Sequence, residues 1–505
     1  MKKYFSAILV CLLIGGNSCK NLDVMPSDAI STETLITTSD GLTNALNGAY
    51  ALFKDHISFN GVVDNNNMYL RQFYHLSDFA SDDIVCGQVT TDPLFYSFSL
   101  DHSPSQGNTR YFWYLSYKII TGVNTVIDAV EKSGTQDPAK QQLLGECYFL
   151  RAFCHFNLVR LFGKPYSIDP ASPGVILRTN LTDPSQKKRS TVAEVYESVI
   201  ADAEKAAGLM TQPRGVQYAS KEAAWALLSR VNLYKEDNQK AIDYANMVIN
   251  SGRFSLTTSA TYPALFANAQ TSPETIFCIA FTAVDDYGKF GSIASMIYSD
   301  GNSGWGEEYA SSSLRNVMSK HPEDVRWSYI VPLKDGSGTV QKKNGIEVYY
   351  ISKFSFQGGL PNLSSPIMFR LSEMYLNKAE AEAKMSNNNA ALDDVDMIRK
   401  NRGLTGSLYN RTLPSGYTAL DVVLEEKRIE MAFEGHRTYD VYRNKRSLNK
   451  AYWGYHLAGL KETDIDLSKT PTGYANLSVS YTSPRIIYFL PIDETLSNPQ
   501  ATQNQ

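Results

Sequence analysis

Two pairs of adjacent carboxylates are the residues of this sequence best suited to general acid–base chemistry. Asp82 and Asp83 form the first pair, and Glu307 and Glu308 form the second; both pairs lie in stretches without regular periodicity. A glycosidase needs only two carboxyl groups, brought by the fold to either side of a glycosidic bond. The sequence does not place the two pairs opposite each other, so glycoside hydrolysis remains one hypothesis.

A third group of acidic residues recurs at every fourth position, which is the repeat of one helix face. Glu426, Glu430 and Glu434 stand among Arg428 and Arg437. Opposite charges at helical spacing stabilise the surface of a helix. The pattern therefore predicts an ion-pair network on a helix face rather than a catalytic site.

Motifs for other catalytic chemistry are absent from the sequence. It has no phosphate-binding glycine loop, no dinucleotide fingerprint and no Gly-x-Ser-x-Gly elbow. Its scattered histidines form no His-Glu-x-x-His pair of zinc ligands. Cys86, Cys147, Cys154 and Cys278 show no paired close spacing, so we expect buried free thiols. We expect no catalytic residues, no metal site and no cofactor.

Composition and charge argue against nucleic acid as a ligand. Of the 505 residues, 43% are hydrophobic and 20% are charged, which is enough apolar material for a large core. The 48 basic and 52 acidic residues give a net charge of −4, without the basic excess of a nucleic-acid-binding surface. Tyrosine outnumbers phenylalanine 31 to 22, and rings with a polar tip suit ligand surfaces.

The start of the chain is typical of a secreted, lipid-anchored protein. Two lysines precede the apolar run Phe5 to Ile14, and small residues then lead to Cys19. Such a run is too short to span a bilayer as a helix, and no later stretch is long enough. We predict that residues 1–18 are a lipoprotein signal peptide and that residues 19–39 hold the lipidated cysteine and a tether. Plain signal-peptidase cleavage near Ser18 is the alternative.

Helical periodicity dominates the rest of the chain, and most periodic segments are neighbours joined by short polar turns. The arrangement predicts a mainly α fold of antiparallel helical pairs. The periodic segments are Asp40–Lys54, Tyr111–Lys132, Ala139–Leu161, Thr191–Leu209, Ser220–Lys235, Asn238–Asn250, Ile367–Lys384, Ala390–Arg402 and Ala419–Phe433.

Two of these pairs share the spacing of a tetratricopeptide unit, in which small residues stand where the two helices come closest. Ordinary packing of a helical hairpin is the alternative explanation. The positions are Trp225, Leu228, Ser229, Ala241 and Val248 in one pair, and Tyr375, Ala379, Ala391, Val395 and Ile398 in the other.

The periodicity breaks in two long stretches, near residues 59–108 and 251–366. The segments Thr275–Phe281 and Glu347–Phe354 predict strands within the second stretch. Long irregular segments in a compact protein are usually functional. We therefore expect both stretches to face a ligand.

Several blocks, in order along the chain, carry a specific signature. The first block is Cys19–Pro26 and the last is Leu490–Asn504. Between them, Glu146–Gly163 reads ECYFLRAFCHFNLVRLFG and Glu425–Arg443 reads EEKRIEMAFEGHRTYDVYR. Together they resemble the SusD/RagB family of Bacteroidetes outer-membrane lipoproteins. The sequence departs from the family pattern at Asn444, where members of the family often have a tryptophan after the arginine of this late helix.

The resemblance implies a single domain over residues 40–505. This domain would be a helical scaffold of four tetratricopeptide-like pairs with an irregular, partly β-stranded remainder. It also implies a non-catalytic lipoprotein at the cell surface that captures oligosaccharides or polysaccharides for nutrient uptake. Such proteins pass the glycan to a SusC-like TonB-dependent outer-membrane transporter, their partner. The alternatives are a tetratricopeptide-type lipoprotein that docks peptides or proteins, and a glycoside hydrolase.

A glycan presents an apolar C–H face and a ring of hydroxyls, so its site needs exposed aromatic rings with amide or charged groups beside them. Trp305 lies between glycines in DGNSGWGEEY, close in sequence to Tyr298, Asn302 and Tyr309. We predict these four as glycan-binding residues; packing of Trp305 onto the helices is the alternative. A weaker set, for which solvated or turn-forming roles are the alternative, is Asn67, Arg71, Asp83 and Tyr96.

Overall fold

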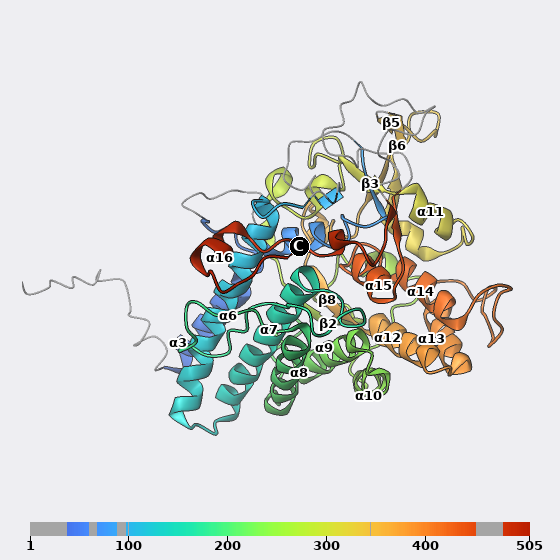
Figure 1. Cartoon of the computed structure of the whole chain (residues 1–505). Coiled ribbons are helices and arrows are strands. Elements are labelled where there is room, and N and C mark those ends of the chain that lie inside the picture. The colour runs from blue at the N-terminus through green and yellow to red at the C-terminus, as the bar shows by residue number, and fades with distance from the viewer. Residues whose placement is uncertain are drawn as a thin grey trace, which may run out of the picture.

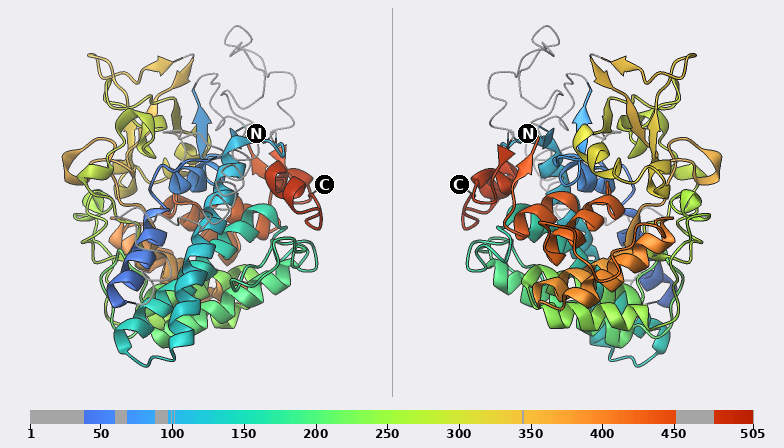
Figure 2. Two further views of the ribbon diagram at one scale, coloured as in Figure 1. Left: turned by 90° about the vertical axis from the view of Figure 1, so that its left-hand side faces the viewer. Right: turned by 90° about the vertical axis from the view of Figure 1, so that its right-hand side faces the viewer.

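A layer of helices and a layer of short strands and loops make up the protein (Figure 1). The long helices lie in the lower part of the view, whereas β3 (Glu308–Ala310), β5 (Lys342–Lys343) and β6 (Ile346–Glu347) lie above them with the short helix α11 (Ser312–Met318). The side views in Figure 2 show the same division. No helix in the described part of the chain is long and apolar enough to cross a membrane. The computed structural model describes residues 38–59, 68–87, 97–98, 100, 102–343, 345–450 and 478–504.

The long helices pack against one another in chain order, from α6 to α10 and on to α12 and α13. This observation confirms the predicted mainly α fold. The helices are α3 (Ser39–Ala51), α4 (Tyr69–His75), α6 (Gly107–Ser133), α7 (Pro138–Phe162), α8 (Val192–Leu209), α9 (Lys221–Lys235), α10 (Asn238–Ile249), α11 (Ser312–Met318), α12 (Leu371–Lys384), α13 (Asn388–Asn401), α14 (Ala419–Glu430), α15 (Arg437–Arg443) and α16 (Ile492–Ser497).

Local sequence signals set several helix boundaries. Thr191 and Glu194 form a capping box at the start of α8. Asp137 caps α7, whose first residue is Pro138, a residue with no amide hydrogen to leave unpaired. Gly134 ends α6 in the left-handed region, at φ 60°.

The helices α9 and α10 approach closely where the repeat pattern predicts small residues. Ser229 and Ala241 are fully buried, and the hydroxyl of Ser229 donates a hydrogen bond of 3.0 Å to the carbonyl of Ala241. In α12 and α13 the corresponding Ala379 and Ala391 are also fully buried. Because these side chains are short, the helix backbones can come together without a cavity.

The strands are short and pair antiparallel in sheets of two. Val85 of β1 faces Tyr309 of β3, so the two irregular stretches of the sequence meet at this ladder. The strands are β1 (Ile84–Cys86), β2 (Thr275–Cys278), β3 (Glu308–Ala310), β4 (Ile330–Pro332), β5 (Lys342–Lys343), β6 (Ile346–Glu347), β7 (Tyr349–Ile351), β8 (Ile367–Arg370), β9 (Leu448–Asn449) and β10 (Ser478–Val479).

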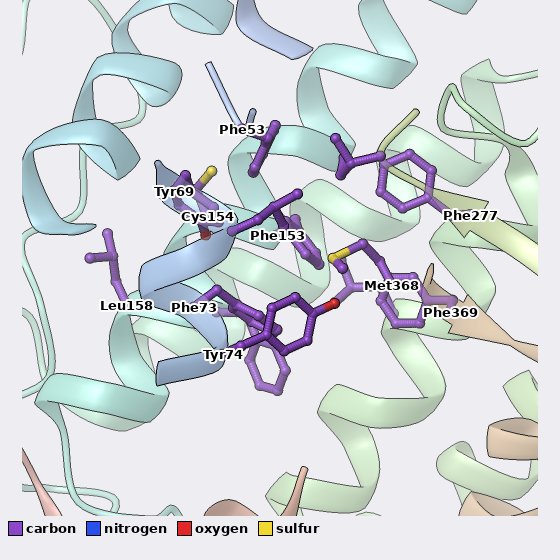
Figure 3. Close-up of a cluster of buried hydrophobic side chains, with 14 of the residues drawn as sticks. Phe53, Tyr69, Phe73, Tyr74, Phe153, Cys154, Leu158, Phe277, Met368 and Phe369 are labelled. Atoms are coloured by element: carbon purple, nitrogen blue, oxygen red, sulfur yellow. The ribbon is translucent and has the colours of Figure 1, made fainter. Parts of the chain in front are cut away.

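An aromatic core joins the two layers (Figure 3). Phe153 of α7 lies 6.4 Å from Phe277 of β2, 6.1 Å from Phe369 of β8 and 6.0 Å from Phe53, as ring-centroid distances. All four rings are fully buried or nearly so. Edge-to-face contacts of this kind stabilise a core beyond the area that they bury, and they fix the strands on the helical layer.

Two of the predicted boundaries were wrong. Residues 367–370 form strand β8, which pairs with β2, and α12 begins only at Leu371. Within 59–108, predicted as irregular, Tyr69–His75 forms α4. A strand of four residues is too short to show a recognisable period. The helix predicted from the sequence therefore included the strand that precedes it.

Candidate functional site

The loop that carries Trp305 is fixed by backbone hydrogen bonds to a 3-10 turn, Ala294–Met296. The amide of Trp305 donates to the carbonyl of Ser295 at 2.7 Å, and that of Glu307 donates to the carbonyl of Met296 at 2.8 Å. These backbone hydrogen bonds fix the part of the loop from which the indole projects. A ligand therefore meets a surface that needs little ordering on binding.

Glycine is required on both sides of Trp305. A Cβ atom on Gly304 would lie 2.1 Å from the carbonyl oxygen of Tyr298. Gly306 adopts a φ of 56°, and a Cβ there would lie 2.7 Å from the ring of Tyr350. The glycines thus let the loop approach its support closely.

Asp300 closes the tip of the same loop. Its carboxylate accepts hydrogen bonds from the amides of Asn302 at 2.9 Å and Ser303 at 2.8 Å. Hydrogen bonds from Ser303 and Asn302 lower the pKa of Asp300 to about 2, so it stays ionised. Asn362 also donates to the carbonyl of Ser303.

Two exposed aromatic rings form a corner on this surface. Trp305 is 44% exposed and Phe290 is 61% exposed, and their ring centroids are 5.8 Å apart with planes at 80°. The ammonium of Lys289 lies 3.9 Å from the centroid of the Trp305 ring. Exposed flat rings can stack on the C–H face of a sugar, so the corner fits a pyranose ring.

A hollow of about 390 Å³ adjoins this aromatic corner. Lys289, Asp300, Trp305, Lys343 and Tyr350 are among the residues that line it. It combines an aromatic wall with a phenol, two ammonium groups and a carboxylate. This mixture of apolar and polar groups is what a polyhydroxylated ligand requires.

The sequence-predicted residues near Trp305 divide into two groups. Tyr298 is half-buried, with its ring 5.2 Å from that of Phe356, and Asn302 is exposed in the turn. Tyr309 is only 1% exposed, because β3 directs its ring inward to within 5.9 Å of the ring of Tyr350. The prediction that Tyr309 faces a ligand was therefore wrong.

Two members of the weaker predicted set are also buried. Arg71 lies in α4 and is 2% exposed. Asp83 is fully buried, with a carboxylate oxygen 2.7 Å from the guanidinium of Arg428. These two residues were wrongly predicted to face a ligand, since a charged group buried in this way needs its partners inside the protein. Asn67, Tyr96 and Cys19 lie outside the described residues.

Sequence reasoning missed Phe290, Lys289 and Lys343. A signal for Phe290 is present, because it stands in GKFG between Gly288 and Gly291, as Trp305 stands between two glycines. The two lysines carry no comparable signal, since exposed lysines occur on every protein surface.

Asp82, Asp83 and Glu308, three of the four acidic residues considered for catalysis, are buried, and Glu307 is half-buried. Asp82 pairs with Arg437 at 2.8 Å, and Asp83 pairs with Arg428. Glu308 is fully buried in β3. The described residues contain no group of three or more His, Cys, Asp or Glu side chains arranged to hold a metal ion. Cys147, Cys154 and Cys278 are buried free thiols, as predicted, and Cys86 is also buried.

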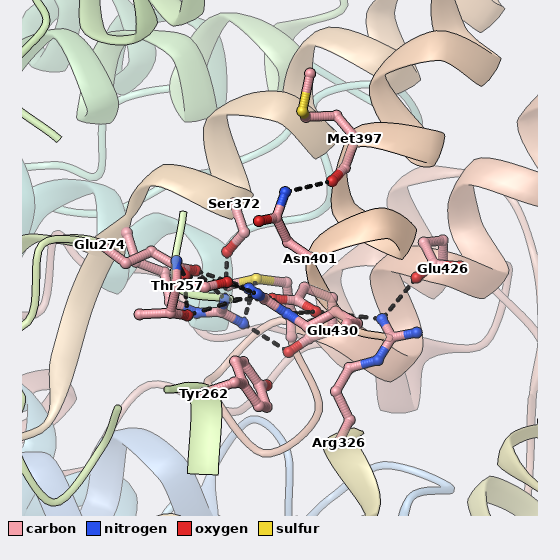
Figure 4. A network of polar contacts seen from close by, with 12 residues as sticks. Thr257, Tyr262, Glu274, Arg326, Ser372, Met397, Asn401, Glu426 and Glu430 are labelled. Atoms are coloured by element: carbon pink, nitrogen blue, oxygen red, sulfur yellow. Dashed lines mark hydrogen bonds and ion pairs between the residues drawn. The ribbon is translucent and has the colours of Figure 1, made fainter. Parts of the chain in front are cut away.

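The predicted network around Glu426, Glu430 and Glu434 exists, but it is buried and uses other arginines (Figure 4). Glu430 lies 2.7 Å from Arg402 and also pairs with Arg370. Burial raises the pKa of Glu430, but these arginines outweigh that effect and hold it well below its usual range. The network ties α13 and α14 to β8 and is structural.

Comparison with known protein families gives two matches that together span most of the chain. A family described as "Starch-binding associating with outer membrane" matches residues 20–233, and one described as "SusD family" matches residues 297–505. The chain belongs to the SusD/RagB family. This confirms the resemblance seen in the sequence blocks.

Individual members of the SusD/RagB family match over most of their length. SusD-like protein P2 of Formosa agariphila is 28% identical over 494 residues, covering 88% of this chain and 91% of the relative. A SusD superfamily protein of Bacteroides thetaiotaomicron, whose crystal structure is known, is 28% identical with a TM-score of 0.79, covering 92% of this chain and 99% of the other. A SusD superfamily protein of Bacteroides vulgatus is 25% identical with a TM-score of 0.76, covering 93% of this chain and 98% of the other.

Proposed function

We propose that this SusD/RagB family member is a cell-surface lipoprotein that binds glycans without cleaving them. The observation that carries the proposal is the exposed corner of Trp305 and Phe290 on a loop fixed by backbone hydrogen bonds. Two rings at a steep angle contact a sugar on two sides. The hydroxyls of the sugar are bound by the polar groups of the adjoining hollow.

The experiment is a glycan array probed with the protein lacking residues 1–18. The proposal expects at least one class of oligosaccharide to bind, with Trp305→Ala weakening that binding. An array on which no saccharide binds, with the fold intact by circular dichroism, would contradict it. Capture of a specific peptide under the same conditions would favour the alternative of a peptide-docking lipoprotein.

The proposal includes delivery of the captured glycan to a SusC-like TonB-dependent transporter in the outer membrane. It is supported by family membership, and one matching family is described as associating with the outer membrane. Purification of the tagged protein from outer membranes, followed by mass spectrometry, should recover a transporter of this class. Recovery of the protein alone would count against the partnership.

Anchoring through Cys19 is part of the same proposal. The short apolar run before this cysteine is typical of a lipoprotein signal. Cys19→Ser should abolish incorporation of labelled fatty acid and release the protein from membranes, because several acyl chains supply a firm attachment. Unchanged labelling would exclude this residue as the anchor.

Absence of hydrolysis is the remaining part of the proposal. It is supported by the burial of Asp83 and Glu308 and by the ion pair of Asp82, which leave these carboxylates without access to a substrate. Incubation of the protein with the saccharide that it binds should release no reducing sugar. Release of reducing ends that persists in highly purified protein would favour the alternative of a glycoside hydrolase.

A further inference from the structure

Two ammonium groups, those of Lys289 and Lys343, line the hollow beside Trp305. Lys289 lies over the Trp305 ring, and Lys343 lies 3.4 Å from the phenol oxygen of Tyr350. Neither lysine has a carboxylate within 4.0 Å among the residues that the structure describes. Both side chains are at least partly open to solvent and line the hollow.

The acidic residues nearest to Lys289 in the sequence already have other partners. Asp285 pairs with Lys54 at 2.7 Å, and Asp286 accepts a hydrogen bond from the amide of Gly288 at 2.9 Å. Asp300 is the one carboxylate among the described residues that line the hollow, and the amides of Asn302 and Ser303 bind it. The hollow therefore carries excess positive charge directly beside its aromatic wall.

The position of Lys289 bears on which sugars can stack on Trp305. A neutral pyranose that stacks on the ring must compete with the ammonium for the indole, and it offers the ammonium only hydroxyl oxygens in return. A sugar that carries an anionic group can place that group on the ammonium while its C–H face contacts the ring. Hydrogen bonds to a charged acceptor are about twice as strong as neutral ones.

Resting on the glycan-binding function proposed above, we propose that the hollow selects anionic saccharides, whose carboxylate or sulfate groups pair with Lys289 and Lys343 while a pyranose ring stacks on Trp305. The two lysines determine specificity, and Trp305 supplies the stacking common to all sugars.

The test compares matched saccharides that differ only in charge. The probes are oligogalacturonate and its carboxyl-reduced form, and a sulfated galactan oligosaccharide and its desulfated form, together with neutral glucans and mannans. Calorimetry should give at least tenfold tighter binding for one anionic probe than for its neutral counterpart. That preference should shrink as sodium chloride rises from about 0.05 to about 0.5 M, because salt screens ionic contacts at an exposed site.

Variants separate charge from stacking. Lys289→Met and Lys343→Met should each reduce affinity for the anionic probe several-fold, and the double variant should remove the preference. Lys118→Met is the matched control. Lys118 is an exposed lysine of α6 that also lies near an aromatic ring, 5.7 Å from that of Tyr114, but it does not line the hollow. This control should leave every affinity unchanged.

The outcomes test the charge preference and the proposed glycan-binding function separately. If neutral saccharides bind as tightly as the anionic probes, or if binding of anionic probes is unchanged in the double lysine variant, the charge preference is wrong. In that case Trp305-dependent binding of neutral sugars still supports the proposed function. If no saccharide of either kind binds, both proposals fail. The carboxylate and sulfate probes show which anionic group is recognised.

Discussion

The ring plane of Phe290 stands at 80° to that of Trp305, with 5.8 Å between the two centroids. Both rings are exposed, and each stands near glycines in the sequence. Large exposed aromatic pairs are unusual on a protein surface that contacts only water, because such area is usually buried. The pair therefore marks the place where we expect a ligand.

Removing either ring should weaken saccharide binding. We expect Trp305→Ala and Phe290→Ala each to cost about 1 kcal/mol or more in binding free energy, the scale of one aromatic contact. Calorimetry with a saccharide identified on the array measures the effect. Tyr417→Ala is the control, because Tyr417 is 38% exposed but lies at a different pocket. A loss of the same size in Tyr417→Ala would show that the effect is not specific to the corner.

Displacing the loop should weaken binding without unfolding the protein. In Gly304→Ala the new methyl group would meet the carbonyl of Tyr298 at 2.1 Å, so the loop must shift and carry Trp305 with it. Gly122→Ala, in α6, has open space around the new methyl group and should be neutral or slightly stabilising. Equal saccharide affinity in both variants, measured by calorimetry, would argue against a role for the fixed loop.

The helices were predictable from sequence because their apolar faces repeat over many residues. The sequence predicts a helix over Asn238–Asn250, and α10 spans Asn238–Ile249, with Ala241, Ala245 and Val248 on its buried face. The burial of Tyr309 was not predictable, because its strand partner Val85 is far away in the sequence. The partners of Glu430 could not be predicted from the sequence either, because Arg370 and Arg402 reach it from other elements.

At the candidate site, sequence reasoning identified Trp305 but not its surroundings. The flanking glycines indicated an accessible ring, and the ring is exposed. The contact with Lys289 depends on how two loops fold onto one another, which no local pattern encodes. The structure thus brings Lys289 and Lys343 to the site, whereas Arg71 and Asp83, the charged residues predicted from the sequence, are buried elsewhere.

The buried network should matter far more to stability than an exposed ion pair. Glu430→Gln removes the charge that Arg402 and Arg370 share, leaving buried guanidinium groups without compensation. We expect a loss of about 3–5 kcal/mol in the free energy of unfolding. Arg411→Ala breaks an exposed pair of 2.7 Å with Asp393 and should leave the free energy of unfolding almost unchanged, because exposed ion pairs contribute little to stability. Denaturant unfolding would contradict the prediction if the two losses were equal.

Acid should destabilise the fold through protonation of His102. His102 stacks on Tyr488 at 3.9 Å, and burial lowers its pKa from 6.5 to about 4. Below pH 6.5 the unfolded chain therefore takes up the proton before the folded one, and stability is lost as pH falls towards about 4. The loss from this residue is about 3 kcal/mol, since one pKa unit corresponds to about 1.4 kcal/mol.

The variant His102→Phe keeps a ring against Tyr488 but cannot be protonated. Relative to the wild type, its stability should improve as pH falls from 6.5 to about 4 and should then stay constant. Denaturant unfolding at several pH values measures the difference between the two proteins. A difference that does not change with pH would mean that His102 does not titrate as proposed.

Binding of saccharides to the wild type and to Trp305→Ala, measured side by side on one glycan array, tests the central claim most directly. We expect the wild type to bind at least one class of oligosaccharide and the variant, equally folded, to lose most of that signal. Identical binding patterns for the two proteins, or no binding by either, would contradict it.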